Sequence, residues 1–196
     1  MSAALQSEDY YVSPEQYLAA EQLRETRHEY VAGKGYAMAG TTAQHERIAN
    51  NILRELGNQL RGRRCEAFGS NLRVRIRLPG RAEFYYYPDA LVDCSRLPAK
   101  AIYAEAPAVI FEVMSADTER VDVGEKLSNY RTLPSLRVYV LVNQNNPAVT
   151  IYRRVEDEWR MEFLGTIDAT LDMPEVDCRL PLAEIYERVL GELPSA

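Results

Sequence analysis

The sequence predicts an α/β fold in which a mixed central sheet is flanked by helices, with added β-hairpins. Residues 108–114 and 137–142 are almost continuous apolar runs, a pattern typical of strands buried on both faces of a sheet. Between them, residues 115–132 begin with helix-starting polar residues and continue with an apolar stripe at helical spacing. Strand, crossover helix and strand therefore form one right-handed βαβ unit.

The N-terminal part is predicted to hold a short helix and a hairpin. Ser13 is placed as the N-cap, Pro14 as the first helical residue and Gln16 as the reciprocal partner of a capping box. This helix should end at about Arg24. Two short apolar runs flank Gly33-Lys34-Gly35, which predicts a hairpin at the margin of the sheet.

A longer helix is predicted to follow. Thr41 and Gln44 form a second possible capping box. The apolar stripe behind it consists of Ile48, Ile52, Leu53, Leu56 and Leu60. His45 and Glu46 lie in the first turns, where they are either ordinary surface residues, the usual case, or look into a site at the end of the sheet. We favour the surface interpretation for Glu46.

Two further hairpins complete the predicted sheet. Residues 72–78 and 84–92 pair around Pro79-Gly80-Arg81, and residues 148–154 and 158–165 form a final hairpin that covers a sheet edge.

Length and composition indicate one domain. The 196 residues are enough for one well-packed core and short for two. We assign residues 1–12 to a flexible N-terminus, 13–190 to the domain, which ends in a helix over 181–190, and 191–196 to a C-terminal tail. Because no apolar segment reaches a membrane-spanning length and a signal-peptide pattern is absent, we expect a cytoplasmic protein without membrane contact.

The cysteines, the histidines and the motifs that the sequence lacks argue against several kinds of site. Cys65, Cys94 and Cys178 are odd in number and widely spaced, which predicts reduced thiols rather than a disulfide framework. With two histidines and no CxxC pair, a structural zinc site is not expected. The sequence also lacks the phosphate-loop patterns GxxxxGK[ST] and GxGxxG, as well as HExxH and GxSxG.

The charge distribution leaves two interpretations of the arginines open. A net charge of −6 argues against a protein that coats nucleic acid indiscriminately. Six arginines could nevertheless meet a phosphate backbone: Arg61, Arg63, Arg64, Arg73, Arg75 and Arg77. The alternative, which we favour slightly for the strand arginines, is a solvated outer face of an antiparallel strand.

Two carboxylates stand where apolar strands normally exclude charge. Glu112 lies inside the run 108–114, and Asp89 directly follows Pro88 on an upstream strand. A buried carboxylate needs a partner, either a basic side chain or a metal ion. With Lys126 on the crossover helix, the two acids could converge on one divalent ion and one phosphate, although a structural ion pair between Glu112 and Lys126 would satisfy the same pattern.

The ordered set of these residues resembles a known family. The motifs that carry the resemblance are Pro88-Asp89, Glu112-Val113-Met114-Ser115, Asp122, Gly124-Glu125-Lys126-Leu127 and Tyr130. Together with flanking segments from roughly Ser13 to Val189, they are similar to the Uma-type restriction endonuclease family of the PD-(D/E)XK nuclease superfamily. The resemblance implies a restriction-endonuclease-like fold and a Mg²⁺-dependent endonuclease, with Mn²⁺ as a possible substitute, that hydrolyses DNA by a metal-activated water.

The resemblance also implies roles for individual residues. Asp89 and Glu112 match the metal-binding acids, and the backbone carbonyl of Val113 would be a further ligand. The superfamily places its catalytic lysine where this chain has Met114, and in this family Lys126 takes over that role. Two other acids remain open: Glu46 corresponds loosely to an accessory acidic position, and Asp122 is expected to orient Lys126 or cap its helix.

The sequence leaves alternatives open for the dimer contact and for the activity. By analogy with nucleases that cut both strands, we expect a homodimer, with Tyr85-Tyr86-Tyr87 or the final hairpin as its contact. The main alternative to an endonuclease is a catalytically weak or inactive nucleic-acid-binding or interaction domain with the nuclease fold. A hydrolase of another phosphate ester is a third, weaker option.

Overall fold

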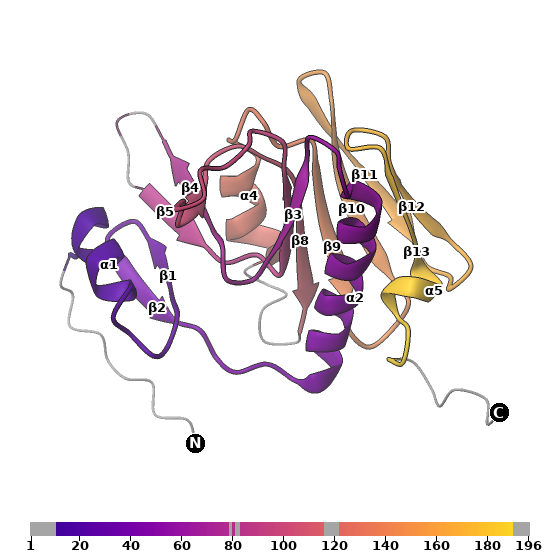
Figure 1. Cartoon of the computed structure of the whole chain (residues 1–196), viewed down its shortest axis with the longest axis horizontal. Helices are drawn as coiled ribbons and strands as arrows, with labels where there is room; N and C mark the ends of the chain where they lie inside the picture. The colour runs from indigo at the N-terminus through magenta and orange to yellow at the C-terminus, as the bar shows by residue number, and fades with distance from the viewer. Residues whose placement is uncertain (1–10, 79, 81–82, 116–121, 190–196) are drawn as a thin grey trace.

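The computed structural model in Figure 1 describes residues 11–78, 80, 83–115 and 122–189. Its largest sheet has six strands in the order β11-β10-β9-β8-β6-β3. These strands are β3 (Glu66–Gly69), β6 (Ala90–Asp93), β8 (Pro107–Met114), β9 (Val138–Asn143), β10 (Val149–Val155) and β11 (Glu158–Leu164). The sheet is mixed, because β8 and β9 run parallel while the neighbouring pairs are antiparallel.

A second sheet and a short ribbon complete the β structure. The five-stranded sheet has the order β2-β1-β5-β4-β7, and β12 pairs with β13. The strands are β1 (His28–Val31), β2 (Lys34–Ala37), β4 (Arg73–Arg77), β5 (Glu83–Tyr86), β7 (Tyr103–Ala104), β12 (Thr170–Met173) and β13 (Cys178–Pro181). The helices are α1 (Pro14–Glu21), α2 (Ala43–Leu60), the π-helical turn η1 (Asp122–Lys126), α4 (Leu127–Tyr130) and α5 (Leu182–Ile185).

The six-stranded sheet is covered on both faces. One face packs against α2, α5 and the β12–β13 ribbon, which Figure 1 shows in front of and beside the sheet. The other face packs against α4 and part of the five-stranded sheet. Along β8 the two faces alternate, so that Phe111 and Val113 point into the first core and Ile110 into the second. Glu112 lies two residues after Ile110, so its side chain points to the same face of the sheet as that of Ile110.

The first predicted helix is confirmed, with its capping box in place and its end a few residues earlier than predicted. The Ser13 N–H donates to Gln16 Oε1 at 2.8 Å and the Gln16 N–H to Ser13 Oγ at 3.2 Å, which is the predicted capping box. The helix ends at Glu21 rather than near Arg24. Of the predicted flexible segment 1–12, only Tyr11 and Val12 are among the described residues, and the Val12 N–H donates to the Gly33 carbonyl at 2.9 Å.

The second helix begins one residue later than predicted. Thr42, not Thr41, is the N-cap of α2, and its hydroxyl accepts from the His45 N–H. A threonine at either position offers the same oxygen, so the pattern alone did not separate them. The predicted stripe is otherwise confirmed, since Ile48, Ile52 and Leu56 are buried against the sheet.

The predicted single strand over residues 84–92 is wrong. The chain leaves the five-stranded sheet after Tyr86, passes through Pro88 and Asp89, and enters the six-stranded sheet at Ala90. Proline cannot donate to a ladder, which ends the first strand. The Asp89 N–H then donates to the Phe111 carbonyl at 3.1 Å and starts the second.

The C-terminal prediction is right for the hairpin and wrong for the helix. β10 and β11 form the predicted final hairpin at an edge of the sheet. The helix predicted over 181–190 is only the single turn α5, followed by turns to residue 189. The strands β3, β12 and β13 were not predicted. In the crossover, η1 and α4 lie inside the predicted helical segment, of which residues 116–121 are outside the described part.

The three strand arginines differ in exposure, and only Arg77 is exposed as the solvated-face interpretation expects. Arg75 lies 2.8 Å from Glu83, and Arg77 lies 3.1 Å from Glu105. The buried Arg73 guanidinium lies over the rings of Tyr17 and Tyr87. Acids and aromatic rings of the same chain therefore engage all three guanidinium groups.

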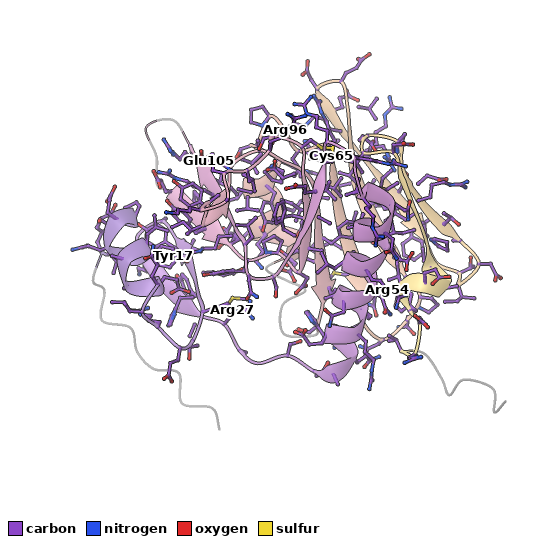
Figure 2. All side chains as sticks on the ribbon, viewed as in Figure 1. Tyr17, Arg27, Arg54, Cys65, Arg96 and Glu105 are labelled. Carbon is purple, nitrogen blue, oxygen red and sulfur yellow. A yellow bond between two sulfur atoms is a disulfide. The ribbon has the colours of Figure 1, made fainter. Side chains whose placement is uncertain are left out.

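The prediction of three reduced cysteines is wrong for two of them. Cys65 and Cys94 form a disulfide, visible in Figure 2 as a yellow bond near the Cys65 label, whereas Cys178 is free and buried. The cause is the antiparallel register of β3 and β6, which pairs Glu66 with Asp93 and so places the flanking cysteines opposite each other. The sequence separation of 29 residues hides this proximity.

The disulfide gives a stability prediction. Replacing both Cys65 and Cys94 by Ser should lower the free energy of unfolding by about 3 kcal/mol, because the bond closes a long loop in the unfolded chain. Urea unfolding with and without reductant measures this, and the reductant should have no effect on the double variant. Equal midpoints for the oxidised and reduced parent protein would contradict the prediction.

Candidate functional site

One buried ammonium group is the centre of the site. Lys126 Nζ lies 2.9 Å from Glu29 Oε1, 3.3 Å from Asp122 Oδ1 and 3.4 Å from Glu112 Oε1. Asp122 is on the same helical turn, whereas Glu29 comes from β1 and Glu112 from β8. Lys126 is 7% exposed, and three acids from separate elements therefore share one positive charge away from bulk water.

Tyrosines line this charge cluster. The Tyr130 hydroxyl donates to Glu112 Oε1 at 3.2 Å, and the Tyr139 hydroxyl donates to the Asp122 carbonyl at 3.0 Å. The Lys126 ammonium also lies 5.7 Å from the centre of the Tyr86 ring. The rings exclude water while their hydroxyls bond to the polar groups, so the charges interact in surroundings of low polarity.

Burial and charge act on the acid and the base in opposite senses. Burial raises the pKa of Glu112 well above its ordinary value, and the charges of Asp122, Asp89 and Glu29 add to this, while Lys126 opposes it. For Lys126, burial alone would lower the pKa, but the attraction of Glu112, Glu29 and Asp122 raises it well above its ordinary value. The lysine is therefore protonated at neutral pH.

Asp89 lies at the point where the chain changes sheets. Its Oδ2 accepts from the Val113 N–H at 2.7 Å and lies 3.3 Å from His45 Nε2 in the first turn of α2. Burial lowers the pKa of His45, but the hydrogen bond and charge of Asp89, with help from Glu46 and the Val113 backbone, raise it overall. His45 and the Val113 backbone thus fix the orientation of Asp89.

The structure brings most of the predicted residues together. Glu112 and Lys126 are in direct contact, and Asp89 is close enough for its charge to act on Glu112. Val113 contributes its N–H to Asp89. Among the described residues, no group of three or more histidine, cysteine, aspartate or glutamate side chains is arranged to hold a metal ion.

Two residues of the site were not predicted to belong to it. Glu29 makes the shortest contact to Lys126, and its signal in the sequence is one acid in a short strand between His28 and Tyr30. His45 was left open between surface and site, and the structure places it in the site. Glu46 is exposed, in agreement with the surface interpretation.

The family of the chain follows from a match that covers most of its length. The family model Uma2, described as "Putative restriction endonuclease", matches residues 14–181. The chain belongs to the Uma2 family. This confirms the resemblance that the sequence motifs carry, and membership supports a nuclease-like function.

Two similar proteins match most of this chain, and one solved structure matches its fold. The chain is 32% identical over 150 residues to the uncharacterized protein slr1290 of Synechocystis sp., covering 76% of this chain and 77% of that protein. It is 30% identical over 155 residues to the uncharacterized protein sll1609 of the same organism, covering 76% and 86%. A crystal structure described as a putative nuclease belonging to DUF820 from Anabaena variabilis superposes with a TM-score of 0.73 at 20% identity, covering 91% of this chain and 99% of that one. The restriction-endonuclease-like fold is therefore confirmed.

Within residues 11–189, leaving out the undescribed positions, no helix has both the length and the apolar character to cross a membrane.

The charge cluster gives a pH-dependent stability prediction. Replacing Lys126 by Met should lower the free energy of unfolding by about 3–5 kcal/mol at neutral pH, because buried carboxylates lose their cation. The pKa of Glu112 in the folded state lies above its unfolded value, so the folded state binds the additional proton and the loss should shrink at acid pH.

Urea unfolding at about pH 5.5 and about pH 8, with a chelator present, measures both effects. Lys100→Met is the matched control, since Lys100 is exposed. A loss of equal size at both pH values would contradict the assignment of Lys126 as the counter-charge of buried acids.

Proposed function

We propose that this Uma2 protein is a Mg²⁺-dependent endonuclease that hydrolyses DNA phosphodiester bonds. The observation that supports this most directly is a local excess of negative charge. The carboxylates of Glu29, Asp89, Glu112 and Asp122 surround one ammonium group and one imidazole. Even with His45 protonated, acids outnumber cations, and such a place favours a divalent cation.

The donor chemistry of the site fits Mg²⁺. Asp89 and Glu112 would hold the ion, with the Val113 carbonyl as the further ligand that the family resemblance implies. Mg²⁺ prefers carboxylate oxygens and keeps several waters, so two acids are a sufficient protein contribution. When bound, the ion would lower the pKa of a coordinated water and polarise a phosphoryl oxygen. Mn²⁺ takes the same oxygen ligands and is the expected substitute.

Lys126 supplies a positive charge that does not titrate near neutral pH. Asp122 and Glu29 hold its ammonium beside Glu112, and Tyr130 bonds to the same Glu112 oxygen. An ammonium held in this way requires little reorganisation when negative charge builds on a scissile phosphate. His45 contacts Asp89 and the Val113 backbone, as an orienting group rather than a proton donor to substrate.

The implied partners are DNA and a second copy of the chain. Family membership favours a nucleic-acid substrate, and a duplex has two strands to cut, which favours a homodimer. The Tyr85-Tyr86-Tyr87 segment is excluded as the contact because all three side chains are buried.

The proposal predicts the effect of conservative substitutions. Asp89→Asn and Glu112→Gln should each reduce Mg²⁺-dependent nicking of supercoiled plasmid by about 100-fold or more, because the ion contributes several kcal/mol to the barrier reduction. Both variants should keep the far-UV circular dichroism of the parent protein.

Glu25→Gln is the matched control, since Glu25 is an exposed acid outside the charge cluster. It should nick at the parent rate. Undiminished nicking by both Asp89→Asn and Glu112→Gln would reject the mechanism.

A second function is favoured by one feature of the site. Glu112 Oε1 already bonds to Lys126 and Tyr130, so a closed ion-pair cluster in a nucleic-acid-binding domain without efficient catalysis would have the same geometry. Calorimetric titration with Mg²⁺ and Mn²⁺ distinguishes the two. A metal-binding site should give heat that disappears in Glu112→Gln, whereas a binding module should give the same titration for both proteins.

A further inference from the structure

The strand β11 is a long, open sheet edge. It is the last strand of the six-stranded sheet among the described residues, and it pairs with β10 over seven consecutive residues without a bulge. Natural edge strands are usually short or carry proline, a bulge or charged side chains, above all lysine, that prevent further pairing. The sequence of β11, EWRMEFL, has no proline, lysine or bulge, and its charged residues are Glu158, Arg160 and Glu162, whereas the opposite edge β3 is four residues long and ends in Gly69.

The side chains of β11 add an apolar row to this edge. Met161 is 66% exposed and Phe163 is 63% exposed, and the half-buried Trp159, whose ring packs against Arg131 and Arg154, lies on the same face as both. Single exposed apolar residues need no explanation, but two of them in line with a half-buried tryptophan along an open strand are typical of an interaction surface.

The backbone N–H and carbonyl groups of Trp159, Met161 and Phe163 also point away from the sheet. The Arg154 N–H donates to the Arg137 carbonyl, so Arg154 faces β9 rather than β11. The peptide groups of alternate residues in a strand point to the same side, so the N–H and carbonyl of Tyr152 also point to β9. Tyr152 therefore forms no ladder bonds with Met161, the residue opposite it on β11, and the N–H and carbonyl of Met161 point away from β10. The same parity applies to Trp159 and Phe163. The apolar residues are therefore the ones with outward peptide groups.

The opposite face of β11 carries alternating charge. Arg160 stands opposite Arg153, while Glu162 lies 2.8 Å from Arg153. A like-charge pair across a ladder is unfavourable, and Arg160 forms no ion pair with any residue of the described chain. Arg160 therefore lies beside a second arginine, Arg153, while the acid Glu162 follows two residues later on the same strand.

We propose that β11 pairs with β11 of a second copy of this chain, antiparallel and centred on Met161. In this register Met161 faces the partner's Met161, Trp159 faces the partner's Phe163, and Arg160 faces the partner's Glu162. The two-fold axis repeats each contact. The outward peptide groups form the new ladder, the apolar row becomes continuous across the axis, and each Arg160 gains an acid.

The register is selected by the sequence of the strand itself. A shift by two residues in either direction would place Arg160 opposite an arginine or an apolar residue and would leave part of the apolar row unpaired. A shift by one residue would bring the outward peptide groups out of phase with those of the partner. The acidic net charge and the self-complementary pattern favour a second copy over nucleic acid as the occupant.

The oligomeric state tests the surface. Sedimentation velocity of the full chain at micromolar concentration should show a dimer, and Met161→Arg should be monomeric because two buried guanidinium groups would meet at the axis. Met161 is exposed in the single chain, so this variant should keep the far-UV circular dichroism of the parent protein. Arg61→Glu, on an exposed arginine at the end of α2, is the control and should remain dimeric.

Charge reversal and cross-linking test the register. Arg160→Glu should raise the dimer dissociation constant by about tenfold or more, since both cross-axis ion pairs become repulsive. Under oxidation, Met161→Cys should cross-link to itself. Phe163→Cys should not, but should cross-link when mixed with Trp159→Cys.

Several outcomes would overturn the proposal: a monomeric parent protein, a Met161→Arg dimer, or a dimer in which Phe163→Cys cross-links to itself as readily as Met161→Cys. Binding of DNA that is lost in Met161→Arg while the parent protein is monomeric would instead assign the edge to nucleic acid. None of these measurements uses nuclease activity, so the surface and the proposed catalysis are tested independently.

Discussion

A lysine ammonium with almost no access to water can remain charged only if acids replace the lost hydration. Lys126 has three such acids, and the way they reach it shapes the molecule. Glu29 belongs to the five-stranded sheet, Glu112 to the six-stranded sheet and Asp122 to the helical turn between β8 and β9. One electrostatic centre therefore joins both sheets and the crossover.

The passage from Tyr86 to Ala90 links the two sheets covalently at the same place. The Tyr87 N–H donates to Glu29 Oε1 at 3.2 Å, and Asp89 two residues later accepts from the Val113 N–H at 2.7 Å. Glu29 thus bonds both to Lys126 and to the connecting segment, while Asp89 bonds to the strand that carries Glu112. The geometry of the candidate site is therefore determined where the layers meet: strands hold Glu29 and Glu112, a helical turn holds Asp122, and Asp89 lies in the connection between the sheets.

The sequence was sufficient for features that depend on neighbouring residues. The continuous apolar run 108–114 identified Glu112 as a buried acid, and the strand-helix-strand pattern together with the family motifs placed Lys126 near it. Glu29 and the pair Cys65–Cys94 depend instead on which distant strands become neighbours. β1 and β3 are four residues long and lack a regular alternation of polar and apolar residues, so their pairing partners and register carried no local signal. The sheet change at Pro88 was missed for the same reason.

The proposed pairing of β11 also limits what a dimer could do with two sites. Glu112 pairs with Leu141, Leu141 with Thr150 and Thr150 with Phe163, so the acid lies in a cross-strand row three strands from the edge. Across the axis, two such sites would be seven strand spacings apart, about 34 Å, which is about one turn of B-DNA. A sheet twist of about 20° per strand would, however, rotate one site far from the direction of the other. Concerted cutting of both strands at one position would then require bent DNA, whereas independent nicking by each site would not.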